Sequence, residues 1–395
     1  MKKNKMYLSM DLFSGAGGLS LGLKASGFKT VFASDFDKQI SETYKKNFNN
    51  VNFLCDDIRN IDFNIIKEKL NLKKNMIDLI VGGPPCQGFS MANRKRIEDD
   101  SRNLLFRNFT DAVKIIKPKC FLIENVTGIK SEDIKIDNRR QSTTEAITQY
   151  FLKMNYSIRF TSFKSEEFGI PQFRRRVLIV GTNLENKRKL LDRNEIGDLE
   201  LKYKNYESMK NKNDNQFELF SEKKKSPFTV WDAISDLPQI EAGEGKNEMS
   251  YGTEIKNDYQ KKMRKRSKKV YNHLSTPHDK MAIKRIKLIN QGQNFRDLPS
   301  KLKTKSVHSG AWGRLSADGL SPTITTRFDT PSCGRVIHPF SHRTITVREA
   351  ARLQSFPDTF IFYGTRTSQG QQVGNSVPPL VAEKIGEMFI KQFLG

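Results

Sequence analysis

Residues 6–23 read MYLSMDLFSGAGGLSLGL, and this stretch decides the fold. The apolar run from Met6 to Phe13 is typical of a buried strand. The segment from Ser14 to Gly18 then predicts a tight turn, because glycine reaches backbone angles that other residues avoid. Leu19 to Leu23 opens a helix. A strand that enters a helix through a glycine turn indicates an α/β sheet whose turn amides can approach a ligand.

Residues 1–185 repeat this alternation of short apolar runs and helical stretches. The pattern predicts an α/β fold, with a parallel sheet covered by helices on both faces. The further expected strands are Thr30–Ser34, Asn52–Cys55, Ile77–Val81, Cys120–Ile123 and Arg176–Gly181. Polar residues follow several of these runs. Open α/β sheets bind ligands beyond the carboxyl ends of their strands, so we expect the site at that edge.

The second half of the chain is less regular. Residues 186–225 are rich in Lys, Asn, Glu and Asp, which indicates a linker or an exposed insertion. Val347–Gln354 is expected to be a short helix with Glu349 and Arg352 exposed. An apolar helix, Leu380–Phe393, is expected to close the chain.

Composition points to a polyanionic partner. The 395 residues carry a formal net charge of +24. The charge is clustered in Lys261–Lys269, which weakens the alternative of an evenly solvated basic surface. Four scattered cysteines without a C-x-x-C pair predict neither a zinc site nor a disulfide framework, and they suit a reducing cytoplasm. Neither a signal peptide nor a membrane span is predicted.

A cysteine stands at the tip of a stiff turn. Ile77–Val81 is followed by Gly82–Pro85, whose glycines and prolines stop the strand, and then by Cys86. A thiol held at the end of a core strand is where an α/β protein places a nucleophile. A buried structural cysteine beside a turn is the alternative, and the turn by itself leaves both readings open.

Other strand-end residues suggest a nucleoside-containing ligand. Asp35 ends the second strand and is placed to accept ribose hydroxyls, while Phe36 beside it can stack on a purine. Asp57 can accept from an adenine amino group. Strand-end aspartates also cap turns, so that reading stays open. A nicotinamide dinucleotide site is the main competing interpretation.

Two further groups are candidates for the chemistry. Glu124 follows four apolar residues, and burial raises a carboxyl pKa, so it is a candidate proton donor. Helix capping or a salt bridge would explain it equally well. Arg174 and Arg176 lie on one side of an extended segment and can hold an anionic or carbonyl-rich ligand, or simply begin a basic strand.

Five motifs occur in a fixed order along the chain: Phe13–Gly18, Pro84-Pro85-Cys86-Gln87, Glu124-Asn125-Val126, Gln172-x-Arg174-x-Arg176 and Gly374-Asn375-Ser376-Val377-Pro378. Together they closely resemble the DNA (cytosine-5) methyltransferase family of bacterial restriction-modification systems. The resemblance covers nearly the whole chain apart from about residues 186–305. It implies a Rossmann-like S-adenosylmethionine-dependent fold and replaces the structural reading of Cys86 with a catalytic one.

The resemblance assigns roles to particular residues. Cys86 would be the nucleophile, Glu124 would hold the cytosine N3 edge, and Arg176, with Arg174 beside it, would hold the carbonyl oxygen. The cofactor S-adenosyl-L-methionine would be bound by Phe13, Ser14, Gly15, Gly17, Gly18, Asp35, Phe36, Asp57, Ile58, Pro84, Leu105, Asn375, Ser376 and Val377. No metal is expected.

The resemblance also implies double-stranded DNA as the partner. Residues 87–104 resemble the loop that closes over DNA, but lack the glycine often found near its tip. The residues expected to contact DNA are Gln87, Ser90, Arg94, Lys95, Arg96, Arg264, Arg266 and Thr325. We expect a catalytic and cofactor-binding domain over 1–185, a smaller irregular, β-rich target-recognition domain over 186–345, and a return to the catalytic domain over 346–395.

The leading hypothesis is therefore a sequence-specific DNA cytosine-5 methyltransferase. We expect a prokaryotic, cytoplasmic monomer that associates with the nucleoid through DNA, beside a separate cognate restriction endonuclease. A tRNA cytosine-5 methyltransferase is the second hypothesis, because one branch of the family has much the same motifs. A catalytically inactive DNA-binding homologue is the third, and intact Cys86 and Glu124 argue against it.

Overall fold

The structure is a computed structural model of the chain. It describes residues 6–85, 105–130, 133–136, 139–188, 191, 227–304 and 309–395, with the backbone alone for 133–136 and 139–141. The expected nucleophile Cys86 and the expected DNA loop 87–104 lie outside the described residues. So do 192–226, which contain most of the expected insertion.

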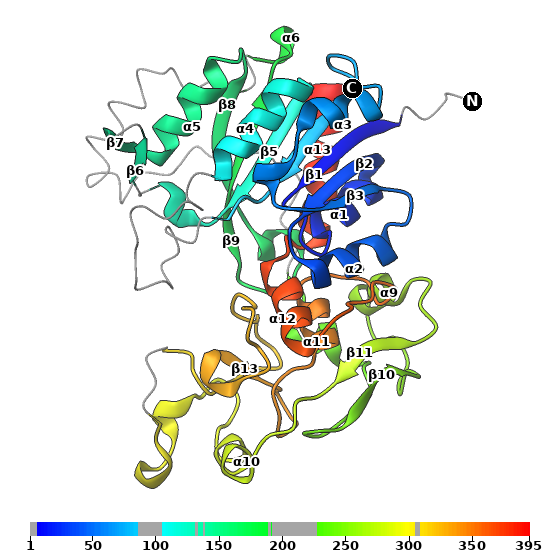
Figure 1. Cartoon of the computed structure of the whole chain (residues 1–395). Coiled ribbons are helices and arrows are strands. Elements are labelled where there is room, and N and C mark those ends of the chain that lie inside the picture. The colour runs from blue at the N-terminus through cyan, green and yellow to red at the C-terminus, as the bar shows by residue number, and fades with distance from the viewer. Residues whose placement is uncertain are drawn as a thin grey trace.

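A seven-stranded sheet forms the upper part of the molecule (Figure 1). Its order is β3-β2-β1-β4-β5-β9-β8, with bounds β1 Tyr7–Leu12, β2 Phe28–Asp35, β3 Asn52–Cys55, β4 Leu79–Gly82, β5 Cys120–Asn125, β8 Ser157–Lys164 and β9 Arg175–Thr182. The six predicted strands are present. The prediction of a parallel sheet is right for β1–β5 and wrong beyond them, because β9 pairs antiparallel with both β5 and β8. A connection that runs from β8 directly into β9 leaves no room for a crossover helix.

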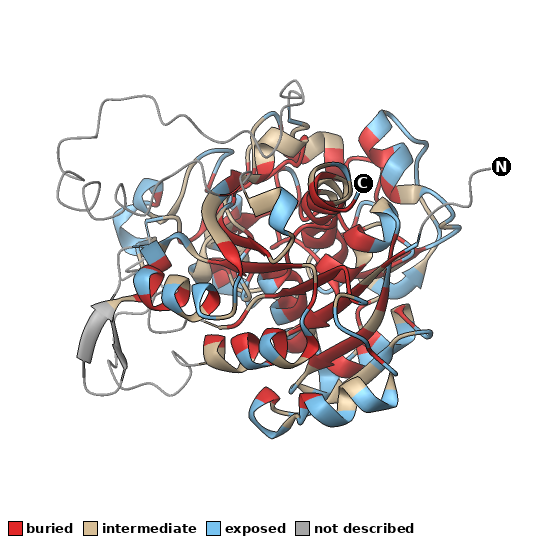
Figure 2. Cartoon of the chain, turned by 90° about the horizontal axis from the view of Figure 1, so that it is seen from above, coloured by how far each residue is buried: buried red, intermediate tan, exposed pale blue. Residues whose placement is uncertain are grey.

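Helices cover both faces of this sheet, as predicted. Alternate strand residues point to opposite faces. On one face, strand residues such as Met10 and Ile123 pack against α3 (Phe63–Lys69), α4 (Leu105–Ile116) and α5 (Thr143–Leu152). On the other, residues such as Val81 and Leu122 pack against α1 (Gly18–Ser26) and α13 (Pro379–Phe389). The buried core runs through the whole upper part (Figure 2).

The lower part of the molecule is irregular (Figure 1). Its described elements are α8 Val230–Ile234, β10 Gly245–Met249, α9 Asp258–Arg264, β11 Val270–Leu274, α10 Lys280–Lys287, β12 Gly313–Arg314 and β13 Arg335–Ile337. The strands form two short sheets, antiparallel β10–β11 and parallel β12–β13. Arg314 organises this part: its buried guanidinium donates to the backbone oxygens of Ile286, Ile289, His338 and Ser341 at 2.6–2.8 Å.

Helices α11 (Val347–Leu353) and α12 (Arg366–Asn375) lie where the two parts meet (Figure 1). The prediction that Glu349 and Arg352 are exposed on α11 is wrong, since they are 2% and 0% exposed. Each finds partners in the interior: Glu349 accepts two 2.8 Å bonds from Arg343, and Arg352 donates to Asp358 at 2.6 Å. Pairing of this kind is what permits a charge to be buried.

Helix α13 returns the chain to the upper sheet, and a π-helical turn, Ile390–Leu394, follows it. The helix packs against α1, so the two ends of the chain lie side by side (Figure 1). We propose that the chain divides at residues 185 and 345 into a catalytic domain, a target-recognition domain and a C-terminal segment that returns to the catalytic domain. Across the parts of the chain that the structure describes, no helix is both long and apolar enough to span a membrane.

Candidate active site

The glycine turn between β1 and α1 has an open side. Phe13 and Gly15 both have left-handed backbone angles, with φ of 56° and 54°. A Cβ built on Gly15 would meet no atom within 4 Å, whereas one on Gly17 would collide with Phe48. Ser14 is buried beneath the turn. The turn therefore packs tightly at Gly17 and leaves open space beside Gly15, where a ligand can approach the backbone.

Strand ends β2 and β3 border this turn. The Asp35 carboxylate accepts from the Gly15 amide at 2.9 Å and from the Asp37 amide at 3.1 Å. Burial raises the pKa of Asp35 above its ordinary value, opposed by these amide bonds. A carboxylate has about four acceptor positions, so Asp35 keeps acceptor capacity for a hydroxyl group beyond its amide bonds. Phe36 beside it is 70% exposed, as a ring that stacks on a ligand would be.

Asp57 has a local structural role. It accepts from the Arg59 amide at 2.9 Å as the cap of a short 3₁₀ helix, Ile58–Asn60, and it pairs with the Arg59 side chain at 2.5 Å. These bonds, the side-chain bond from Arg59 first, lower the pKa of Asp57. The turn-capping interpretation is thus observed, and a bond to an adenine amino group stays a prediction. Ile58 is buried in the core below it.

The far end of the chain forms the opposite side of the turn. A Cβ on Gly18 would collide with the Val377 carbonyl, and one on Gly374 would lie 2.6 Å from the Thr325 backbone. Asn375 is exposed, while Ser376 and Val377 are buried. The expected cofactor residues from both ends of the chain therefore lie together around one turn.

Glu124 ends β5 beside the turn that leads to Cys86. A Cβ on Gly83 would lie 3.5 Å from Glu124 Oε2, and Asn125 Nδ2 donates to the Pro84 carbonyl at 3.2 Å. Glu124 is 9% exposed and lies 3.2 Å from Arg176 Nε through Oε1. That oxygen accepts no well-aligned hydrogen bond from the described residues. It therefore keeps acceptor capacity for a ligand next to a guanidinium.

Arg174 and Arg176 differ in their surroundings. Residues 174, 175 and 176 alternate between buried, exposed and half-buried, so Arg174 and Arg176 share a face, as predicted. Arg174 is 2% exposed and donates through Nη1 to the Gly374 carbonyl at 3.1 Å. Burial, together with the charge of Arg176, lowers the pKa of Arg174 to about 9. Arg174 thus joins the Glu124 region to the C-terminal wall of the glycine turn.

The other predicted positions are more scattered. Leu105, the first residue of α4, is half-buried against the main core. Arg264 is partly buried, pairs with Asp236 at 3.3 Å and lies over the Tyr251 ring at 3.7 Å, which favours a structural role for it over a DNA contact. Arg266 and Thr325 are exposed. The residues expected to touch DNA within 87–104, from Gln87 to Arg96, lie outside the described residues.

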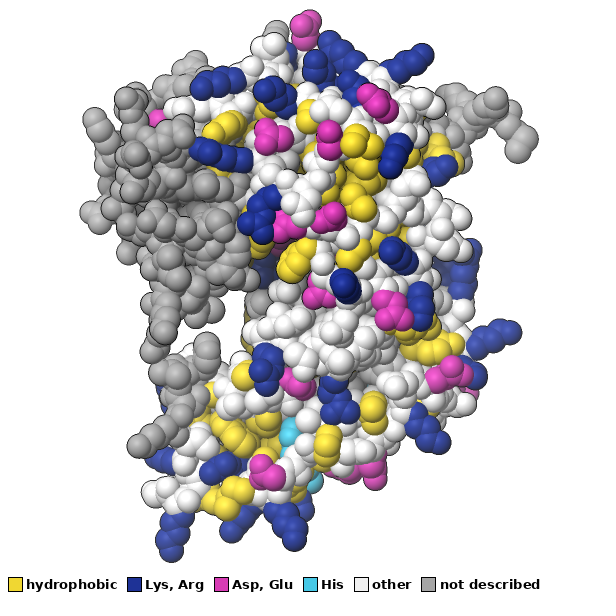
Figure 3. Space-filling view, in the orientation of Figure 1, with side chains coloured by type: hydrophobic (Ala, Val, Ile, Leu, Met, Phe, Trp, Pro, Cys, Tyr) yellow, Lys and Arg dark blue, Asp and Glu magenta, His cyan; other side chains and the backbone are white. Residues whose placement is uncertain are grey.

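Lys and Arg are spread over the face seen in Figure 3, with Asp and Glu between them, so this face carries no single basic stripe. The basic run 261–269 begins on α9, which Figure 1 places on the opposite side of the molecule from β9.

Within the described residues, no group of three His, Cys, Asp or Glu side chains could hold a metal ion.

Sequence reasoning missed the residues that join these parts. Gln172 and Gln354 are buried and hydrogen-bonded to each other at 3.1 Å, 182 residues apart. Strand β8 was missed as well, although Ser157–Lys164 contains Ile158, Phe160 and Phe163. Ile158 and Phe160 alternate with polar residues and were the available signal, whereas Phe163 packs on the opposite face of the sheet.

Comparison with known proteins identifies relatives along the full chain. The family model for C-5 cytosine-specific DNA methylases matches residues 7–391. The type II methyltransferase M.DdeI from Desulfomicrobium norvegicum is 35% identical, over 96% of this chain and 87% of the relative. The type II methyltransferase M1.HphI from Haemophilus parahaemolyticus is 31% identical, over 97% of this chain and 86% of that protein.

A solved structure agrees with these relatives. An E. coli prophage-encoded protein, described as a DNA modification methyltransferase, superposes with a TM-score of 0.73 at 28% identity. The match covers 98% of this chain and 100% of the other. The similarity therefore includes both the upper sheet and the irregular lower part.

Proposed function

The chain belongs to the C-5 cytosine-specific DNA methylase family and is a DNA cytosine-5 methyltransferase, and from this premise we propose how its residues divide the reaction. In the proposed mechanism Cys86 attacks C6 of a flipped cytosine in double-stranded DNA, and C5 takes the methyl group. The observation that carries the proposal is the approach of Glu124, which is paired with Arg176, to the turn that leads into Cys86.

S-adenosyl-L-methionine is the methyl donor that the family implies, and the residues present fit it. The open side of the turn at Gly15, the exposed ring of Phe36 and the spare acceptor positions of Asp35 suit its backbone-binding, aromatic and ribose portions. When bound, it supplies an electrophilic methyl group on a sulfonium. Asn375, Ser376 and Val377 would close the pocket from the other end of the chain.

The chemistry needs two protein groups that act on one ring. Cytosine C5 is a poor nucleophile, and addition of the Cys86 thiolate to C6 converts it into an enamine-like carbon. A proton or hydrogen bond at N3, supplied from the Glu124 carboxyl, withdraws the charge that develops there. After C5 takes the methyl group, C5 loses its proton and the thiolate leaves, which restores the aromatic ring. Arg176 would hold the carbonyl oxygen of the base.

Neither C5 nor C6 can be reached while the base is stacked in a duplex, so the target cytosine must be flipped into the site. We propose that the irregular lower part selects the DNA sequence, by phosphate contacts that position the duplex and base contacts that specify it. A separate restriction endonuclease that reads the same sequence stays a prediction from the restriction-modification relatives.

Trapping on 5-fluorocytosine DNA tests this proposal. Fluorine takes the place of the hydrogen at C5 and cannot leave as a cation, so elimination of the thiolate stops and the enzyme should stay covalently attached to duplex DNA in the presence of S-adenosyl-L-methionine. Denaturing gels should show the adduct for the natural chain and none for Cys86→Ser, while both proteins bind the cofactor equally. Cys120→Ser is the matched control, because Cys120 is a buried core thiol whose pKa burial raises to about 12. Adduct formation by Cys86→Ser, or on tRNA instead of DNA, would contradict the proposal.

A further inference from the structure

Gln172 opens the Gln-x-Arg-x-Arg motif, yet the proposed chemistry gives it no task. Its side chain is fully buried. Its Nε2 donates to the Leu353 carbonyl and to Gln354 Oε1, both at 3.1 Å, and its Oε1 accepts from the Ile324 amide at 3.1 Å. One amide group therefore connects the entry of β9 with two segments that lie more than 150 residues away in sequence.

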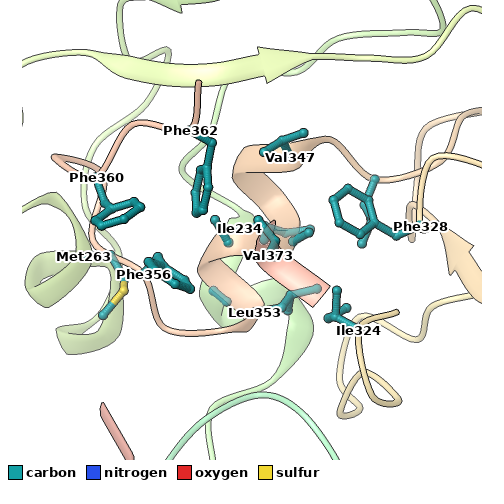
Figure 4. Close-up of a cluster of buried hydrophobic side chains, with 14 of the residues drawn as sticks. Ile234, Met263, Ile324, Phe328, Val347, Leu353, Phe356, Phe360, Phe362 and Val373 are labelled. Carbon is teal, nitrogen blue, oxygen red and sulfur yellow. The ribbon is translucent and has the colours of Figure 1, made fainter. Parts of the chain in front are cut away.

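Both connected segments border the 374–377 wall of the glycine turn. Ile324 precedes Thr325, whose backbone packs against Gly374. Gln354 links Gln172 to α12, because the Gln354 Nε2 donates a hydrogen bond to the Val373 carbonyl at 2.9 Å. Val373 leads directly into the 374–377 wall of the glycine turn. Figure 4 shows the side chains of Ile324, Leu353 and Val373 grouped around α11.

The backbone around Gln172 is held in place as well. The Phe173 amide donates to the Ser321 carbonyl at 2.8 Å, and the Ser321 amide donates to the Pro171 carbonyl at 3.0 Å. Thr323 Oγ1 donates to the Phe173 carbonyl at 2.7 Å. Arg174, two residues after Gln172, donates a hydrogen bond to the Gly374 carbonyl. Arg176, four residues after Gln172, forms an ion pair with Glu124. The strand that carries the base-holding arginine is thus fixed against both other segments through Gln172.

We propose that Gln172 is a positioning residue for methyl transfer. It sets the distance between the Glu124–Arg176 pair, which would hold the cytosine, and the 374–377 wall, which would hold the methyl donor. This inference rests on the proposed function for what those two sites bind. Transfer of a group between two bound molecules is sensitive to their separation, and a misplacement of about 1 Å can cost about 100-fold in rate.

Gln260 provides a matched control, because it is a buried glutamine with the same number of bonds. Its side chain is 0% exposed, donates to the Asp232 carbonyl and to Ser235 Oγ, and accepts from the Lys256 amide. Gln260 lies on α9. Its three hydrogen-bond partners, Asp232, Ser235 and Lys256, all belong to the lower part. Removal of either amide leaves comparable polar groups unpaired, so loss of stability alone should affect both variants alike.

The test compares Gln172→Ala and Gln260→Ala in the full chain, by thermal melting and by single-turnover methyl transfer to duplex DNA. Both should melt at a similarly reduced temperature. Only Gln172→Ala should lose transfer rate, by about 10- to 100-fold, with a much smaller change in KM for DNA. Equal transfer rates for the two variants would overturn the proposal. So would a Gln172→Ala variant that raises KM for DNA and keeps its transfer rate.

A second variant covers the case in which Gln172→Ala does not fold. Gln172→Glu keeps the size and the acceptor for Ile324 but loses both donors, so it should show the same loss of rate. Titration with S-adenosyl-L-methionine in the absence of DNA separates the two proposals. If the natural chain methylates no DNA, the proposed function fails, and weaker cofactor binding by Gln172→Ala than by Gln260→Ala still supports the positioning role. Equal cofactor binding in that case would overturn it.

Discussion

At the scale of single residues, the site depends on groups whose surroundings differ sharply over a few positions. Arg174 and Arg176 are two residues apart, yet one is buried against the Gly374 carbonyl and the other faces Glu124 at 3.2 Å. Glu124 in turn lies beside Gly83 and the path to Cys86. The pair Glu124–Arg176 is therefore the part of the site that the described residues define best.

Glu124→Gln should lower methyl transfer by about 10²- to 10⁴-fold, the usual contribution of a general acid or base. An amide cannot supply the proton at N3, although it fills the same space. Cofactor binding should be unchanged. Steady-state kinetics on duplex DNA checks this, with Glu145→Gln on the exposed face of α5 as the control. A variant that keeps more than a tenth of the natural rate would remove Glu124 from the mechanism.

Asp11 is a buried titrating group beneath the glycine turn. Ser20 Oγ donates to its Oδ2 at 2.6 Å and also contacts the Tyr44 hydroxyl at 2.6 Å. Burial raises the pKa of Asp11 to about 7, from 3.8. The folded state therefore favours the protonated acid. The contribution of Asp11 to stability falls as the pH rises from 3.8 to about 7.

Asp11→Asn should remove that dependence, because the amide cannot ionise. The free energy of unfolding of the natural chain minus that of the variant should decrease between about pH 4 and pH 7, by at most about 4 kcal/mol, and then stay level. Urea unfolding at a series of pH values measures this difference. A difference that is constant with pH would show that Asp11 does not titrate in this range.

At the scale of elements, α11 is held by charges inside the protein. Arg352 bonds both Asp358 and Asp236 with no side-chain exposure. Burial alone would lower the pKa of Arg352, but the two carboxylates raise it above its ordinary value. The apolar side chains of α11, Val347 and Leu353, pack with those of neighbouring elements in one buried cluster (Figure 4).

Asp358→Ala should destabilise the protein by about 3–5 kcal/mol, since it removes one of the two carboxylates that pair with the buried Arg352 and the carboxylate that pairs with the buried Arg348. Glu42→Ala breaks an exposed pair with Lys46, whose side chains are 48% and 49% exposed, and should cost about 0–1 kcal/mol. Chemical denaturation of both variants gives the comparison. A similar cost for the two would mean that the buried network contributes little to stability.

The element scale also shows where sequence reasoning succeeds. Apolar runs predicted the six strands they cover, and the signal is continuous where a strand is buried on both faces, as in β4 and β5. The helical period predicted α11 and α13. The same period wrongly predicted that Glu349 and Arg352 are exposed to solvent. A charged side chain indicates exposure unless its buried ion-pair partner is known. Arg343, Asp236 and Asp358 are those partners, and they come together only in the folded chain.

At the scale of the whole molecule, segments from the two ends of the chain meet at the glycine turn, where Gly18 lies against the Val377 carbonyl. The site residues could be listed from ordered motifs, and their meeting at the glycine turn followed from the resemblance. The contacts between the parts could not be predicted, since Gln172, Gln354 and Arg174 bond mostly to backbone groups, which carry no sequence signal.

Gly18→Ala tests the contact between the ends. The added methyl group would collide with the Val377 carbonyl, and overpacking of this kind costs about 1–3 kcal/mol. The variant should also bind S-adenosyl-L-methionine more weakly, because the pocket wall must shift. Gly252→Ala is the control, since its Cβ would meet only ordinary contacts, at 3.6 Å and beyond. Calorimetric titration with the cofactor would contradict this account if both variants bound it alike.

Bisulfite sequencing of the DNA of a host that expresses the protein tests the central claim most directly. The account predicts that cytosines within one recurring sequence become resistant to conversion in cells with the natural chain, and that none do so with Cys86→Ser. DNA without new protected cytosines from cells that contain the folded natural protein would contradict it.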